Sequence, residues 1–93
     1  MTESPHPGEY LRSVVAEMSE TQDEIARALD VSRYTLNQIL NEHRGVSAPM
    51  ALRMERVLGI DPGDLLRRQG AYDIATVMRR KGPEITGLKP LII

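Results

Sequence analysis

Apolar and polar positions alternate along residues 21–40, TQDEIARALDVSRYTLNQIL, with the period of two short helices separated by a tight turn. The apolar positions on the two predicted inner faces, with the one in the turn, are Ile25, Ala26, Leu29, Val31, Leu36, Ile39 and Leu40. Thr21 followed by Glu24 is the pattern of a capping box, and Ser32 is a favourable N-cap for the second helix. The pattern therefore predicts a pair of helices packed through their apolar faces.

The opposite face of the second predicted helix is polar but uncharged. Its residues, spaced i, i+3, i+4 and i+7, are Tyr34, Asn37, Gln38 and Asn41. Amide and hydroxyl groups in such a row suit the base edges of a DNA major groove, and the whole pattern resembles the helix-turn-helix of the Cro and lambda-repressor superfamily. The alternative is an ordinary helical hairpin with a polar outer face, because motif matches also arise by chance. The small Ala26, the apolar turn residue and the cap favour the DNA-binding interpretation.

One turn position departs from the superfamily pattern. Members of the superfamily usually place glycine at the turn, where a left-handed backbone is needed, and this chain has Asp30. Aspartate adopts that conformation more readily than most residues, so the departure weakens the match only slightly.

Periodicity predicts three further helices. The first begins around His6 and Pro7, the fourth is capped by Ser47, and the fifth is capped by Asp61 and runs to Lys81. Predicted core residues of the first and fourth helices are Leu11, Val14, Val15, Met18, Met50, Met54, Val57 and Leu58. We therefore expect an all-α, five-helix lambda-repressor-like domain at residues 6–81, with the motif at 21–40 and a flexible N-terminus at 1–5.

The C-terminal part carries more apolar surface than a five-helix core needs. The fifth predicted helix is apolar over more than half of its circumference. Gly82 and Pro83 are predicted to end it, leaving residues 82–93 as an extended apolar tail. The alternatives for the tail are a disordered end and a short strand that pairs with a symmetry mate or covers a dimer seam, and we favour the second. The residues expected to mediate dimerisation are Leu66, Ile74, Val77, Met78, Ile85, Leu88 and Leu91.

Composition narrows the class of protein. A chain of 93 residues has material for one core, and such small domains are often stabilised by oligomerisation. The absence of cysteine rules out disulfides and fits a reducing cytoplasm. No long apolar run or signal peptide is present, so we expect a cytoplasmic protein without a membrane partner.

Net charge argues weakly against DNA binding. The total is −1, but residues 1–31 hold seven acidic residues and two arginines, whereas residues 32–93 hold ten basic and six acidic residues. The second part can face phosphate while the first faces away, so we expect modest non-specific affinity and a greater reliance on specific contacts.

Catalysis is not expected. The only histidines, His6 and His43, lie far apart without a paired carboxylate or a cysteine pattern, which leaves neither a metal site nor a nucleophile triad. We expect no cofactor, and we expect His6 to cap or pack the first helix.

Longer segments of the chain resemble a more specific family, the HigA-type antitoxins of type II toxin–antitoxin pairs, which are a branch of the XRE group. The matching segments are HPGEYLR, VSRYTLNQILN, RGVSAPMALRM, GAYDIATV and LKPL, which together span residues 6–91. The resemblance implies a homodimer that represses its own operon at a palindromic DNA operator and neutralises a RelE-like ribonuclease toxin. Two alternatives remain open: a stand-alone XRE-type repressor without a toxin, and a protein-interaction module that does not bind DNA.

Within the motif we expect a DNA-binding set of Thr21, Gln22, Ser32, Arg33, Tyr34, Thr35, Asn37, Gln38, Asn41 and Arg44. Gln22 resembles the superfamily glutamine that anchors a phosphate beside a helix N-terminus, and Thr21 can share that contact. Arg33 is suited to a guanine or a phosphate, and Gln38 is the best candidate for an adenine.

Three other motif positions are assigned with less base specificity. Tyr34 stands where the family often has Gln or Asn, so base preference cannot be transferred there. Thr35 is expected to touch the DNA backbone, and Arg44, with its loop neighbours, to reach the sugar–phosphate backbone. The alternative for Arg44 is a solvated loop charge.

Overall fold

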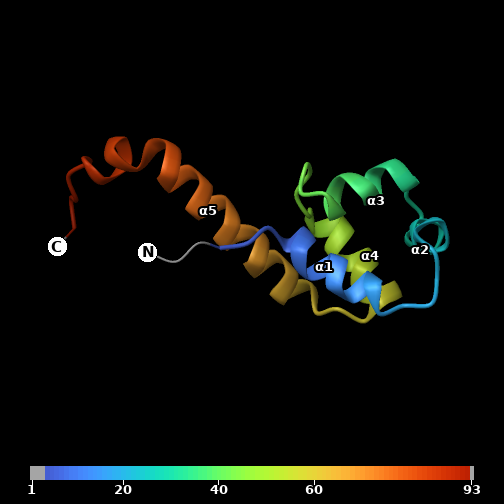
Figure 1. Ribbon diagram of the computed structural model, residues 1–93. Coiled ribbons are helices and arrows are strands. Elements are labelled where there is room, and N and C mark those ends of the chain that lie inside the picture. Colours follow the sequence, from blue (N-terminus) through green and yellow to red (C-terminus); the bar gives the residue numbers. More distant parts are fainter. Residues whose placement is uncertain (1–3, 93) are drawn as a thin grey trace.

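The computed structural model describes residues 4–92 and is built from five helices (Figure 1). They are α1 (Pro7–Ala16), α2 (Gln22–Leu29), α3 (Arg33–Leu40), α4 (Ala48–Leu58) and α5 (Pro62–Thr86). The predicted all-α, five-helix fold is confirmed, and no strand occurs among residues 4–92. The predicted flexible segment 1–5 lies mostly outside the described residues.

Each helix begins at a side chain that accepts a hydrogen bond from a backbone N–H of the first turn. These N-caps are His6, Thr21, Ser32, Ser47 and Asp61, as the sequence predicts. At α2 the capping box is complete, because the Glu24 carboxylate also accepts from the Thr21 N–H at 2.8 Å. A cap of this kind stabilises a helix by about 1 kcal/mol, which explains why local sequence placed the helix starts correctly.

The turn between α2 and α3 is closed by a left-handed residue. Asp30 has φ 59° and ψ 45°, the conformation for which the superfamily uses glycine. The N–H of Val31 donates to the Ala26 carbonyl at 3.0 Å, and Arg53 of α4 donates to the carbonyl of Leu29 at 2.8 Å. These bonds satisfy carbonyls at the end of α2, so aspartate serves at this position as expected.

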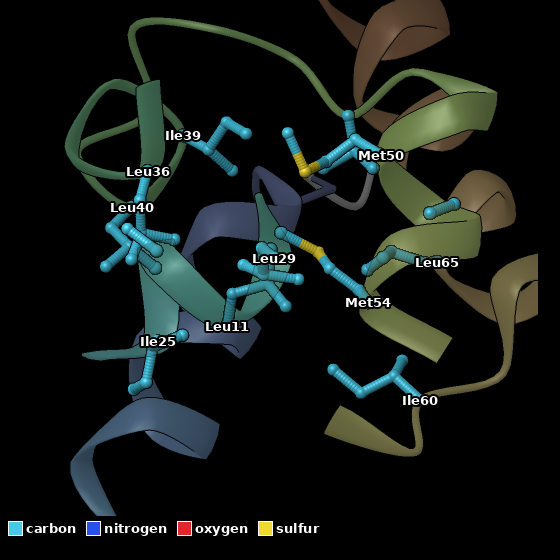
Figure 2. Close-up of a cluster of buried hydrophobic side chains, with 13 residues drawn as sticks. Leu11, Ile25, Leu29, Leu36, Ile39, Leu40, Met50, Met54, Ile60 and Leu65 are labelled. Carbon is cyan, nitrogen blue, oxygen red and sulfur yellow. The ribbon is translucent and has the colours of Figure 1, made fainter. Parts of the chain in front are cut away.

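The core is aliphatic and draws on all five helices (Figure 2). Its buried residues are Leu11, Ile25, Ala26, Leu29, Leu36, Ile39, Leu40, Val46, Met50, Ala51, Met54, Ile60 and Leu65. Five of the predicted core positions, Val14, Val15, Met18, Val57 and Leu58, are half-buried and pack against this cluster. Met18 does so from beyond the end of α1, which is capped at Glu17.

Helix α5 leaves the globule. Its first turns pack through Leu65, and its C-terminal half projects outward, so the molecule measures 51 × 22 × 21 Å (Figure 1). The break predicted at Gly82 and Pro83 is present as a kink, but the extended conformation expected after it is not. The helix is kinked at Lys81, where φ is −127°, and continues to Thr86.

The helix tolerates proline at position 83 because this residue lies in the first turn after the kink, where a missing backbone N–H costs little. Residues 82–86 are therefore helical rather than extended, which corrects the predicted boundary of the tail. The favoured strand is not observed in the tail, because residues 87–92 form no regular secondary structure.

Candidate nucleic-acid interface

Helix α3 is held by one face and presents the other to solvent. Leu36, Ile39 and Leu40 are at most 3% exposed and fix the helix against the core. The reader face, which we define as Tyr34, Asn37, Gln38 and Asn41, lies on the side away from these anchors. Tyr34 and Asn41 are exposed, and Asn37 and Gln38 are half-buried. Helix α3 lies at the edge of the molecule (Figure 1). Its outer face carries uncharged hydrogen-bonding groups, as in a helix that reads DNA.

Arg33 is exposed at the start of α3 and is paired within the molecule. Its guanidinium lies 3.4 Å from a carboxylate oxygen of Asp23 on α2, and both side chains are more than half exposed. An exposed ion pair of this kind contributes at most about 1 kcal/mol. Arg33 can therefore exchange this carboxylate for a phosphate or a guanine at small cost.

Three of the predicted contact residues already have structural partners. The Thr21 hydroxyl accepts from the Glu24 N–H at 3.1 Å, and the Ser32 hydroxyl accepts from the Thr35 N–H at 3.0 Å. The Ser32 hydroxyl also donates to Oγ1 of Thr35 at 3.0 Å. Substituting Thr21 or Ser32 would weaken a helix start as well as remove a predicted DNA contact.

A groove brings three predicted contact residues together. It is lined by Gln22 from α2, by Asn37 and Asn41 from α3 and its end, and by Arg12 from α1. The groove encloses about 310 Å³. The structure therefore places the residue expected to anchor a phosphate next to part of the reader face.

The loop of residues 41–47 folds back on the end of α3. The N–H groups of His43 and Arg44 both donate to the Gln38 carbonyl, at 2.8 and 3.2 Å. The exposed Arg44 guanidinium lies 3.5 Å from Oγ1 of Thr35, so it points back along α3. This position brings Arg44 to the same surface as the predicted contacts of α3.

Sequence reasoning missed two arginines that position these helices. Arg12 of α1 donates to the carbonyl of Leu40 and pairs with Glu42 at 2.9 Å, which places a cation at the C-terminal end of α3. Arg53 performs the same task at the end of α2. The residues of each pair are 28 and 24 positions apart, so local sequence patterns carry no signal for them.

His6 is the one buried charged or polar side chain of the described core, 4% exposed. Its Nδ1 accepts from the Gly8 N–H at 2.8 Å, and its ring meets that of Tyr72 edge-on at 4.8 Å. Burial lowers the pKa of His6, although Glu42 and Asp73 nearby oppose the shift. The predicted capping role of His6 is thus confirmed.

The predicted dimerisation residues are exposed on the projecting half of the molecule. Ile74, Val77, Met78 and Ile85 line one groove of about 330 Å³ together with Asp73, and we call this the α5 groove. Ile74 is 67% exposed and Val77 is 44% exposed. Leu66, Leu88 and Leu91 are also exposed but lie outside this groove.

None of the helices within residues 4–92 has the length and apolar character needed to cross a bilayer. The same residues contain no group of three or more histidine and carboxylate side chains arranged to hold a metal ion.

Comparisons with known proteins find a helix-turn-helix family and solved structures of antitoxins. A helix-turn-helix family model matches residues 21–65. Virulence-associated protein A′ of Dichelobacter nodosus is 37% identical over 78 residues, which cover 83% of this chain and 68% of that protein. Among solved structures, antitoxin GraA superposes with a TM-score of 0.89 at 40% identity, over 99% of this chain and 100% of GraA. Pseudomonas aeruginosa antitoxin HigA with the higBA promoter gives 0.88 at 36% identity, over 97% and 100% of the two chains.

Proposed function

The chain belongs to the helix-turn-helix family that includes the HigA-type antitoxins, and we propose that it binds the operator of its own operon and represses transcription. The observation that carries this proposal is the reader face, a row of uncharged hydrogen-bonding side chains on a helix whose other face is fully anchored. The structure of HigA with its promoter supports the proposal by similarity. The relatives compared are antitoxins and a virulence-associated protein, and none is described as an enzyme.

We propose that the chain binds its operator as a homodimer. One reader helix touches too few base pairs for selectivity, and two-fold dimers place two reader helices about 34 Å apart to read a palindrome. The α5 groove supplies an apolar surface that a second copy would cover. It lies on the projecting half of α5, away from α3, so pairing there leaves both reader faces free (Figure 1).

The second part of the proposed function is neutralisation of a RelE-like ribonuclease toxin in the cytoplasm. Its support is similarity to proteins described as antitoxins, over nearly the whole of this chain and of theirs. A stand-alone repressor would share the fold and the DNA surface but would have no toxin partner.

DNA binding is tested by fluorescence anisotropy with a labelled duplex from the promoter upstream of the chain's own reading frame. A duplex of the same length and composition in scrambled order is the control. We expect binding to the promoter to be at least about a thousandfold tighter than to the control, the lower end for specific DNA-binding proteins. Equal affinity for both duplexes would contradict operator recognition and favour the protein-interaction module.

Toxin neutralisation is tested by expressing the small reading frame adjacent to this one. Growth arrest that is relieved by co-expression of this chain, with co-purification of the two proteins, is the expected result. Operator binding without either effect would favour a stand-alone repressor.

A further inference from the structure

We propose that Gln69 of α5 is a positioning residue for DNA binding, because it holds the loop of residues 41–47 that carries Arg44. This inference rests on the proposed function, since it assigns a role at the same DNA surface. Gln69 lies on α5, outside the helix-turn-helix pair, and it does not belong to the predicted contact set.

Both ends of the Gln69 amide are engaged. Its Oε1 accepts from the N–H of Val46 at 2.7 Å, and its Nε2 donates to Oδ1 of Asp73, one turn further along α5, at 2.9 Å. The amide is thereby fixed in one orientation, with its oxygen toward the loop. A short bond from a side chain 23 residues away replaces the backbone partner that an irregular segment lacks.

The loop backbone lies directly against this amide. A Cβ atom added at Gly45 would lie 3.0 Å from Nε2 of Gln69, which is tighter than most Cβ contacts and would require the Gln69 side chain to shift. Glycine at this position therefore permits the side chain of Gln69 to lie against the loop. Gly45 and Gln69 also line one pocket with Arg44 and Asp73.

The opposite side of the loop is tied to α3. The Arg44 N–H donates to the Gln38 carbonyl, whereas the Val46 N–H, two residues later, donates to Gln69. The Arg44 side chain is exposed, and its one hydrogen-bond contact within residues 4–92 is the 3.5 Å contact with Oγ1 of Thr35. The position of Arg44 is consequently set by the backbone of the loop, which the Gln38 carbonyl holds at Arg44 and the Gln69 side chain holds at Val46.

Asp73 connects this anchor with the α5 groove. The same carboxylate residue that accepts from Gln69 lines the groove beside Ile74. A second copy seated on the groove would therefore contact the residue that orients Gln69. Two hydrogen bonds, from Gln69 to Asp73 and from Val46 to Gln69, would thus connect a dimer contact on α5 with the loop that carries Arg44.

The test compares the Q69L variant with the exchange variant Q69E/D73N. Q69L removes both hydrogen bonds while keeping the size of the side chain. Q69E/D73N keeps the acceptor for Val46 and exchanges donor and acceptor with position 73, without changing net charge. We expect Q69L to weaken operator binding about tenfold and to lower the salt dependence by about one phosphate contact, and we expect the exchange variant to restore both.

A double-mutant cycle separates positioning from general stability. Because Q69L displaces Arg44, R44A should add little to the loss caused by Q69L. The matched control is R33A, which removes an arginine at the other end of α3, and its effect should add to that of Q69L in full. Melting by circular dichroism verifies that each variant is folded.

Several outcomes would overturn the proposal. They are wild-type operator affinity and salt dependence in Q69L, full additivity of Q69L with R44A, no rescue by Q69E/D73N, or no effect of R44A alone. Amide exchange of Val46, measured by NMR on the protein without DNA, tests the anchor separately. If the wild-type protein fails to bind its promoter, the proposed function falls. Loss of Val46 protection in Q69L would still support the anchor, and an unprotected Val46 in the wild type would refute it.

Discussion

The side chains of α3 lie on two faces, a buried one and an outer one, that its helical period keeps apart. Leu36 and Ile39 are 1% exposed, while Tyr34, between them and the helix start, is 65% exposed. A side chain on the outer face can be changed without opening the core. Residue-level effects on DNA binding and on stability should therefore separate cleanly on this helix.

The first prediction concerns base contacts. R33A and Q38A should each weaken specific operator binding by about 1–3 kcal/mol, because each removes a group able to bond a base edge or phosphate. Fluorescence anisotropy measures the loss, and circular dichroism should show unchanged helix content. R33A also frees Asp23 from its ion pair, a change worth at most about 1 kcal/mol in stability. If the double variant R33A/Q38A binds its promoter as the wild type does, α3 is not the reader helix.

The second residue-scale prediction concerns pH. Burial lowers the pKa of His6, so on acidification the unfolded chain takes up a proton at about pH 6.5 and the folded chain takes it up only at lower pH. The contribution of His6 to the stability of the fold is therefore present in full above about pH 6.5 and is lost as the pH drops below that value. The melting temperature should decrease between about pH 7.5 and about pH 5.5.

The control for the pH effect is built into the chain. H6N keeps an N-cap acceptor but does not titrate, so its melting temperature should vary less with pH over the same range. H43N changes the other histidine, which is exposed, and should retain the wild-type dependence. Equal pH dependence in H6N and the wild type would assign the effect to other groups.

At the scale of helices, the anchoring of α3 sets the stability of the motif. L36A should destabilise the fold by about 2–5 kcal/mol, since it opens a cavity under the reader helix. L52A is the matched control, because Leu52 lies on α4 and is 57% exposed, and it should change stability by less than about 0.5 kcal/mol. Urea denaturation measures both. Similar midpoints for the two variants would mean that the register of the motif is wrong.

Helix boundaries were predictable where their causes are local. Thr21, Ser32 and Asp61 cap helices within their own first turns, and the left-handed turn residue Asp30 lies inside the motif itself. The end of α5 was not predictable in the same way. Gly82 and Pro83 stop many helices, yet here a kink at Lys81 lets a further turn begin with the proline near its start.

The candidate site shows the same division. The outer face of α3 follows from its period, so its polar row could be identified from the sequence. The supports behind it could not, because Arg12, Arg53 and Gln69 each bond to backbone atoms 23 to 28 residues away. Contacts of this kind depend on how α1, α4 and α5 pack, and they produce no periodic pattern in the sequence.

At the scale of the whole molecule, the fold separates two surfaces. The reader face lies on the globule, and the α5 groove lies on the projecting half of α5 (Figure 1). A second copy on the groove would bury apolar side chains such as Ile74 and Val77, which are 67% and 44% exposed in the single chain. The elongated shape therefore fits a dimer whose two DNA surfaces stay apart.

The last prediction tests this arrangement by removing residues 83–93. The truncation removes Ile85 from the α5 groove together with the exposed Leu88 and Leu91, but leaves the buried core intact. We expect the shortened chain to fold, to sediment with a larger monomer fraction at micromolar concentration, and to bind its operator more weakly, because a monomer reads only a half-site. The full-length variant V77D places a charge in the groove without touching the tail, and it should give the same two losses. If the truncated chain stays wholly dimeric and binds its operator as before while V77D dissociates, the part of the groove before residue 83 forms the dimer, and residues 83–93 are free to contact the toxin.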